Sequence, residues 1–142
     1  NSYFGLEGIK ERSFSFKTIQ EAIKLKRHLH KLFDKYFGAD KEDSVSGLNV
    51  VVVGGGPTGV EFCGELVGYL RKIAKQHNID NSFVTVDLIE SSPRLLAALP
   101  KDVSERVYKR LHALDCRITA SSYVRNNKRP QVRRKDRKGY CW

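Results

Sequence analysis

One short segment constrains the fold of this chain more than any other, because it joins a strand, a glycine turn and a helix. Residues 48–53 (LNVVVV) form an apolar run typical of a buried strand in a parallel sheet. Gly54, Gly56 and Gly59 follow at the G-x-G-x-x-G spacing, and an amphipathic helical pattern starts directly afterwards. The spacing alone is common in loops, but in this context it indicates a dinucleotide-binding turn.

Each of the three glycines at this spacing has its own steric reason. Gly54 allows a tight exit from the strand, Gly56 lets phosphates approach the backbone, and Gly59 lets the helix pack close to the sheet. The helix N-terminus offers free N–H groups and the positive end of the helix dipole, and Pro57 suits its first turn. We therefore predict a cofactor site without catalytic or metal-binding side chains, in which the chemistry comes from cofactors. The predicted turn residues are Gly54, Gly55, Gly56, Pro57, Thr58 and Gly59.

The segments around this turn alternate between strand and helix patterns. Helical periodicity covers about residues 58–76 and 101–114, and apolar strand runs cover residues 84–89 and 116–120. An alternation of these lengths predicts a right-handed parallel sheet with flanking helices. We expect an α/β fold with a Rossmann-like, three-layer arrangement over residues 48–122, incomplete because it is half of a doubly wound sheet.

Two carboxylates are placed to contact the remainder of a dinucleotide. Glu90 ends the second strand run, where a carboxylate accepts hydrogen bonds from the adenosine ribose and repels a 2′-phosphate. Arg94 lies nearby in the sequence and weakens this preference for NAD over NADP. Glu61 is placed in the first turn of the helix and is predicted to face the nicotinamide end of the cofactor. The alternatives are an ordinary exposed carboxylate at Glu90 and a structural helix cap at Glu61.

A connecting segment, residues 1–47, precedes the first strand. Thr18 and Glu21 form a capping box, apolar residues recur at helical spacing up to Tyr36, and Gly38 is suited to ending the helix. The opposite side of this helix is basic and is interpreted as a solvated surface. Residues 40–47 are a polar linker.

The positive charge of the chain is concentrated at one end. The formal net charge is +10 over 142 residues, and residues 125–142 contain eight Lys or Arg residues against one Asp. Such a composition buries too little surface to offset the entropy of ordering, so residues 123–142 are predicted to be a disordered basic tail. Nucleic-acid or anionic-lipid binding by the tail is the alternative. Nucleic acid is not expected, because no aromatic residues are interleaved with the basic ones.

The three cysteines, Cys63, Cys116 and Cys141, are far apart in the sequence. Without a C-x-x-C spacing they indicate neither a zinc site nor a redox dithiol. Cys63 and Cys116 are predicted to be small buried apolar side chains in a protein of a reducing compartment. The sequence holds no methionine and no apolar run of the roughly 20 residues that span a bilayer. Its start is expected to lie within a longer protein.

Several motifs together resemble those of type II NADH:quinone oxidoreductases, flavoproteins of the pyridine nucleotide-disulfide oxidoreductase superfamily with two dinucleotide-binding domains. The likeness covers about residues 3–120. Its motifs are YFGLEG at residues 3–8, FKTIQEA at 16–22, VVVGGGPTGVEFCGEL at 51–66, LIESSPRLL at 88–96 and LP at 99–100.

This resemblance implies that NADH passes hydride to FAD, which then reduces a quinone at a membrane surface. The 54–59 turn would hold the NADH pyrophosphate, Glu90 the adenosine ribose and Glu61 the nicotinamide end. Residues 1–47 would lead out of a flavin domain, and the FAD, quinone and membrane sites would lie on other segments, so this fragment alone would be inactive.

The resemblance also implies a location. It places the enzyme peripherally at the cytoplasmic face of a bacterial membrane, or at the mitochondrial inner membrane of a eukaryote, with this fragment itself soluble. A homodimer of the full-length protein is compatible with it. Two alternatives stay open: another FAD- and NAD(P)-dependent oxidoreductase of the superfamily, or a nucleotide-binding module with a nucleic-acid- or lipid-binding tail.

Overall fold

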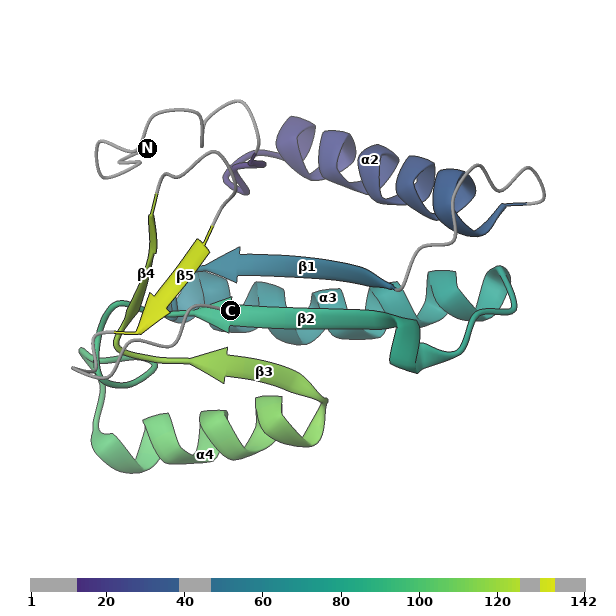
Figure 1. Cartoon of the computed structure of the whole chain (residues 1–142). Helices are drawn as coiled ribbons and strands as arrows, with labels where there is room; N and C mark the ends of the chain where they lie inside the picture. The colour runs from purple at the N-terminus through teal and green to yellow at the C-terminus, as the bar shows by residue number, and fades with distance from the viewer. Residues whose placement is uncertain (1–12, 39–46, 126–130, 135–142) are drawn as a thin grey trace.

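A parallel three-stranded sheet is the centre of the computed structural model, which describes residues 13–38, 47–125 and 131–134. Its strands are β1 (Leu48–Val53), β2 (Val84–Ile89) and β3 (Cys116–Thr119), hydrogen-bonded in the order β1–β2–β3 (Figure 1). Each strand lies within one residue of the range expected from the sequence. The predicted α/β class and the parallel sheet are therefore confirmed.

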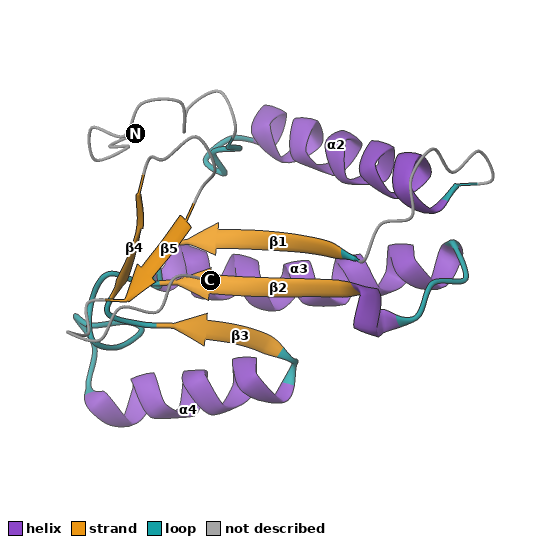
Figure 2. Ribbon diagram, in the orientation of Figure 1, coloured by secondary structure: helices purple, strands orange, loops and turns teal. Residues whose placement is uncertain are grey.

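Helices flank this sheet as the sequence predicts. They are α2 (Ile19–Phe37), α3 (Pro57–Gln76) and α4 (Lys101–Ala113), with a short 3-10 helix at Asn81–Phe83 before β2. Helix α3 covers one face of the sheet, α2 lies beside β1, and α4 lies beside β3 (Figure 2). Of the three predicted layers, the described residues thus contain two, the sheet and the helices on one side of it. None of the described helices combines the length and apolar character needed to cross a bilayer.

Helix α2 begins and ends at the predicted residues. The Thr18 hydroxyl accepts a hydrogen bond from the Glu21 N–H at 3.2 Å, and the Glu21 carboxylate accepts one from the Thr18 N–H at 3.0 Å. Gly38 ends the helix with its N–H donated to the Asp34 carbonyl. A Cβ at Gly38 would lie 2.2 Å from that carbonyl oxygen, so a side chain would not fit.

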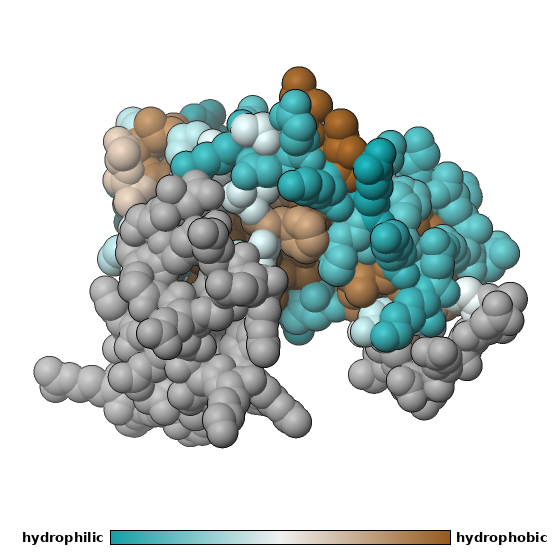
Figure 3. All heavy atoms as spheres, turned by 90° about the horizontal axis from the view of Figure 1, so that it is seen from above, coloured by the Kyte–Doolittle hydropathy of each residue, from teal (hydrophilic) through white to brown (hydrophobic). Residues whose placement is uncertain are grey.

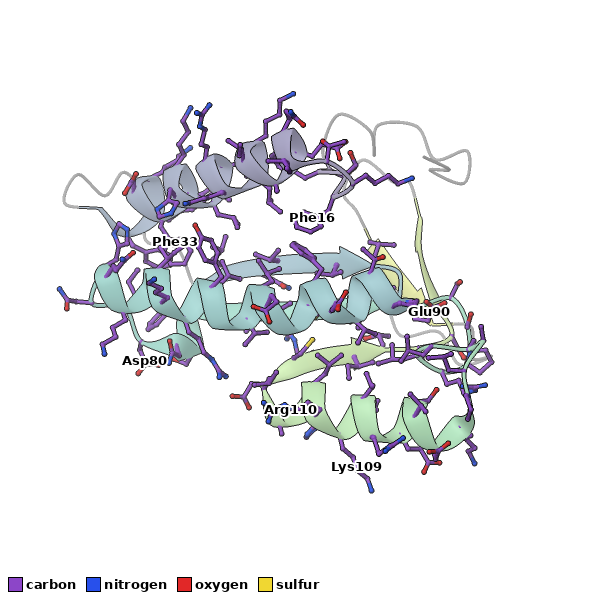
Figure 4. The ribbon with its side chains drawn as sticks, turned by 180° about the vertical axis from the view of Figure 1, so that it is seen from behind. Phe16, Phe33, Asp80, Glu90, Lys109 and Arg110 are labelled. Carbon is purple, nitrogen blue, oxygen red and sulfur yellow. The ribbon has the colours of Figure 1, made fainter. Side chains whose placement is uncertain are left out.

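Aromatic contacts hold α2 against α3. Phe33 is fully buried, and the ring of Phe16 lies 4.3 Å from that of Phe62 between centroids. His30 shares a 2.8 Å hydrogen bond with the Tyr69 hydroxyl. Figure 4 shows Phe16, which precedes α2, and Phe33, near the C-terminal end of α2, on the side of the helix that faces α3.

The apolar periodicity of α2 overstates its buried face. Ile19 and Ile23 are 76% and 43% exposed, whereas Leu29 and Phe33 are buried. At 100° per residue, Ile23 lies on a neighbouring face of the helix rather than on the face that contacts α3. Seen from above, the mostly hydrophilic surface is accordingly interrupted by apolar side chains (Figure 3).

The two faces of β1 differ, although the strand reads as uniformly apolar. Leu48 and Val52 are buried toward α3, whereas Val51 and Val53 are 45% and 63% exposed. The predicted burial of this strand therefore applies to only one of its faces. The alternation is invisible in the sequence because valines occupy the exposed positions too.

A polar ladder crosses the exposed face of the sheet. The Asp87 carboxylate on β2 accepts hydrogen bonds from Asn49 Nδ2 at 3.0 Å and from Arg117 Nε at 2.5 Å. Arg117 also donates to the Thr85 hydroxyl at 3.3 Å. These contacts join all three strands on the side away from α3.

The chain beyond β3 contains more regular structure than predicted. Strands β4 (Ser122–Arg125) and β5 (Gln131–Arg134) form an antiparallel pair in which Val124 lies opposite Val132. For these residues the expectation of a disordered tail is wrong, because cross-strand backbone pairing orders segments that are too polar to form a core. The remainder of the predicted tail lies outside the described residues.

Candidate functional site

The turn between β1 and α3 has the steric properties predicted for two of its glycines. Gly54 has φ +109°, a backbone conformation that strongly favours glycine, and its N–H donates to the Ile89 carbonyl at 2.8 Å. A Cβ at Gly59 would lie 1.8 Å from the Gly54 carbonyl oxygen. Gly54 is therefore needed for the turn, and Gly59 for the close approach of α3 to it.

Gly56 differs from these two glycines because the fold does not require it. It is the N-cap of α3 with φ −75°, which any residue adopts, and a Cβ added to it would meet no protein atom within 4 Å. Its backbone is exposed. The absence of a side chain here leaves open space beside the backbone at the helix N-terminus, which is what the predicted phosphate approach requires.

The first turn of α3 presents backbone donors to this space. Pro57 occupies the first helical position, as predicted, and no side chain caps the helix. The first helical hydrogen bond runs from the Val60 N–H to the Gly56 carbonyl at 3.0 Å. The N–H groups of Thr58 and Gly59 precede it and have no acceptor within the helix, so they are available to an anion.

Glu90 follows β2 directly and is joined to the glycine turn. Its carboxylate accepts hydrogen bonds from the Gly55 N–H and the Ser92 N–H, each at 2.6 Å, and from the Ser91 hydroxyl at 3.1 Å. Figure 4 shows Glu90 at the end of the sheet where α3 begins. The predicted ribose-binding carboxylate therefore also holds the turn in place.

These hydrogen bonds determine the ionisation of Glu90. Partial burial opposes ionisation, but the N–H donors of Ser92 and Gly55 outweigh it, so the pKa of Glu90 lies below its ordinary value of 4.5. A carboxylate with a lowered pKa contributes stability that is fully present above its unfolded pKa. That stability is lost as the pH falls through the folded pKa.

We expect Glu90→Gln to lower the free energy of unfolding by about 1–2 kcal/mol at pH 7, because an amide cannot accept all three hydrogen bonds. The difference from the unsubstituted chain should shrink as the pH falls below 4.5, where the native carboxylate also becomes protonated. Urea unfolding at a series of pH values measures both effects. Glu65→Gln, at an exposed position of α3, is the control and should change little. A Glu90→Gln deficit independent of pH would contradict this account.

Gly55 is one of the predicted turn residues, but the sequence analysis gave it no steric role, and the structure places it in a tight contact. A Cβ at this buried position would lie 2.6 Å from Leu95 Cδ2 and 3.0 Å from Glu90 Cβ. The Gly55 carbonyl also accepts the Leu96 N–H at 2.8 Å. The loop after β2 thus packs directly on the turn, a contact between distant segments that no local pattern signals.

Arg94 is engaged within the same loop. Its guanidinium donates to the Ser104 hydroxyl at 2.6 Å, to the Ala97 carbonyl at 2.7 Å and to the Leu96 carbonyl at 3.2 Å. It links the loop to α4 and is half-buried. These contacts remove the main argument from the sequence that Arg94 would attract a 2′-phosphate.

Glu61 does not lie where the sequence analysis placed it. Helix α3 begins at Pro57, so Glu61 is in its second turn, and the first turn contains no acidic residue. The helix-cap interpretation is therefore wrong. Its side chain is exposed, and contact with a nicotinamide stays a prediction.

Other concave surfaces lie away from this site. A cavity of about 320 Å³ opens between the C-terminal half of α3 and the start of β2, lined by Leu70, Arg71, Val84 and Leu114 among others. This is the opposite end of the sheet from the glycine turn. Within the described residues, no group of three His, Cys, Asp or Glu side chains is arranged to hold a metal ion.

Comparisons with a family model and with individual known proteins agree on the family of this chain. Residues 1–139 match the family described as pyridine nucleotide-disulphide oxidoreductase. A type II NADH:quinone oxidoreductase of Staphylococcus epidermidis is 32% identical over 108 residues, which are 76% of this chain and 27% of the relative. The enzyme of the same name from Staphylococcus aureus is 32% identical over 100 residues, 70% of this chain and 25% of the relative. The chain thus spans about a quarter of the length of these relatives.

Solved structures share the fold. NDH2 from Plasmodium falciparum, determined in complex with NADH, superposes with a TM-score of 0.84 at 24% identity, over 94% of this chain and 28% of that one. A ferredoxin reductase from Rhodopseudomonas palustris superposes with a TM-score of 0.54 at 18% identity, over 82% of this chain and 23% of that one. At these identities the likeness supports the Rossmann-like fold.

Proposed function

Because this chain belongs to the pyridine nucleotide-disulphide oxidoreductase family, we propose that it is the NADH-binding part of a flavin-dependent NADH:quinone oxidoreductase. One observation carries the proposal: at the uncapped N-terminus of α3, Gly56 leaves open space that the fold itself does not require. The names of the staphylococcal relatives support the choice of NADH as donor and quinone as acceptor.

Each residue of the site has a role in this proposal. The N–H groups of Thr58 and Gly59 bind the pyrophosphate, and Gly56 allows it to reach the backbone. The Glu90 carboxylate accepts hydrogen bonds from the adenosine ribose hydroxyls, using lone pairs that are not engaged by the turn. Glu61 contacts the nicotinamide end of the cofactor. FAD would supply the acceptor for the hydride, and its site is assigned to segments other than the described residues.

The remaining partners are proposed from the family and from the relatives' names. Reduction of a quinone requires access to a membrane surface, so we propose a peripheral location at a bacterial cytoplasmic membrane or a mitochondrial inner membrane. Another FAD- and NAD(P)-dependent oxidoreductase of the family is the alternative, and it differs in the electron acceptor. Assays of the complete protein with a quinone and with other acceptors separate the two.

Cofactor choice is the direct test of the site. We expect the chain to bind NADH at least about tenfold more tightly than NADPH, because Glu90 repels a 2′-phosphate while Arg94 is engaged elsewhere. Calorimetric titration with each nucleotide measures the ratio, and Glu90→Gln should reduce it. Equal or tighter binding of NADPH would contradict the proposal.

A titration with an oligonucleotide at two salt concentrations tests the remaining alternative. Salt-dependent binding would favour a basic nucleic-acid-binding segment. NADH binding that is insensitive to salt, with no oligonucleotide binding, supports the oxidoreductase.

A further inference from the structure

The fold brings together two thiols that the sequence separates by 53 positions. Cys63 lies in α3 and Cys116 begins β3, and their Sγ atoms are 2.9 Å apart. Both are free cysteines, and they are 0% and 2% exposed. Their predicted burial is confirmed, but their contact could not be predicted, because it depends on how α3 packs across β2 onto β3.

We propose that Cys63 and Cys116 form a redox-active pair that hydroperoxides convert to a disulfide, linking α3 covalently to β3. A disulfide needs a sulfur–sulfur distance of about 2.05 Å, so the two atoms must approach by about 0.9 Å. We expect rotation of the two side chains to supply this movement, because their sulfurs already touch. The inference does not depend on nucleotide binding.

The surroundings of the two thiols determine which of them ionises and reacts first. The hydrogen bond between the two thiols lowers the pKa of Cys116, although burial acts in the opposite direction. The same hydrogen bond, together with burial, raises the pKa of Cys63. The nearby Asp87 carboxylate opposes ionisation of both thiols. Cys116 is therefore the thiol that ionises first and acts as the nucleophile.

The reaction balances with one hydroperoxide per pair. The Cys116 thiolate attacks a peroxide oxygen, the O–O bond breaks, and Cys116 becomes a sulfenic acid while the released hydroxide takes up a proton. The Cys63 sulfur then attacks the Cys116 sulfur, and the hydroxide that leaves takes the Cys63 proton as water. With hydrogen peroxide, two thiols lose two electrons and the peroxide becomes two waters.

Closure of this bond should stabilise the chain. It joins residues 53 positions apart and so restricts the unfolded ensemble far more than the folded state. We expect the oxidised chain to melt roughly 10 °C higher than the reduced chain. Because both sulfurs are buried, oxidation should require local opening and should be slower than that of an exposed thiol.

The test uses the whole chain with Cys141→Ser, which removes the third cysteine. The chain is treated with hydrogen peroxide under native conditions, and free thiols are then alkylated in denaturant. Intact mass, peptide mapping and thermal melting are measured before and after reduction with dithiothreitol. The matched controls carry Cys141→Ser with Cys63→Ala or with Cys116→Ala and so retain one thiol each.

The expected result is a loss of two hydrogens, a peptide that joins Cys63 to Cys116, and a higher melting temperature that dithiothreitol reverses. The single-thiol controls should show none of these changes. If a control does not fold, the measurements on the Cys141→Ser chain are sufficient to test the proposal. Thiols that stay open to alkylation, sulfinic acids in place of a disulfide, or a disulfide without a rise in melting temperature would each overturn the proposal.

Discussion

Replacement of Gly56 by valine should abolish most NADH binding while the fold persists. A Cβ at this position meets no protein atom within 4 Å, and the backbone angle φ −75° suits any residue. The substitution should therefore change the free energy of unfolding by less than about 1 kcal/mol. The valine methyl groups would occupy the space in which we place the pyrophosphate. We expect the affinity for NADH to fall about 30-fold or more, which is about 2 kcal/mol.

Calorimetric titration measures the loss in affinity, and urea unfolding checks that the variant is folded. Gly68→Ala is the matched control, because Gly68 lies in the same helix, at an exposed position where an added Cβ would meet no atom within 4 Å. It should leave NADH affinity unchanged and raise stability by about 1 kcal/mol, since alanine favours helix. A folded Gly56→Val chain with undiminished NADH affinity would refute the site.

Gly59→Ala should have the opposite profile, with its main effect on the fold. The added Cβ would lie 1.8 Å from the Gly54 carbonyl oxygen. Gly54 belongs to the turn and Gly59 to the start of α3, and the fold holds these two segments together. Relief of this contact requires α3 to move away from β1, which disturbs the packing of its buried residues. We expect a loss of about 3 kcal/mol in the free energy of unfolding.

Urea unfolding of Gly59→Ala beside Gly68→Ala isolates the effect of position, because both are the same substitution in α3. The two variants should differ in stability by about 4 kcal/mol. Hydrogen exchange should show the additional loss of protection at the start of α3. Similar stability of the two variants would mean that the close contact between Gly59 and Gly54 is unimportant.

The elements of this fold were predictable because their signals are local. Thr18 and Glu21 mark the start of α2, the glycine spacing marks the start of α3, and the strand runs match β1 and β2. Burial was less predictable. Val51 and Val53 look like core residues but are exposed, and Ile19 is 76% exposed at an apolar helical position.

Two of the features that sequence reasoning missed depend on contacts between distant segments. The hydrogen bond from Gly55 to Glu90 joins residues 35 positions apart, and the thiol contact joins residues 53 positions apart. The pairing of β4 with β5 depends on backbone groups rather than on composition. The steric roles of Gly54 and Gly59 could be predicted because they are local.

The position of Glu90 also affects attempts to redesign cofactor choice. Exchange of an acidic group for a small or basic one is the usual way to admit a phosphorylated ribose. In this chain the same exchange would strip the Gly55 and Ser92 amides of their acceptor. A successful NADPH-accepting variant therefore requires a compensating group that rebuilds the loop. A single substitution at Glu90 should change the cofactor preference only at a cost in stability.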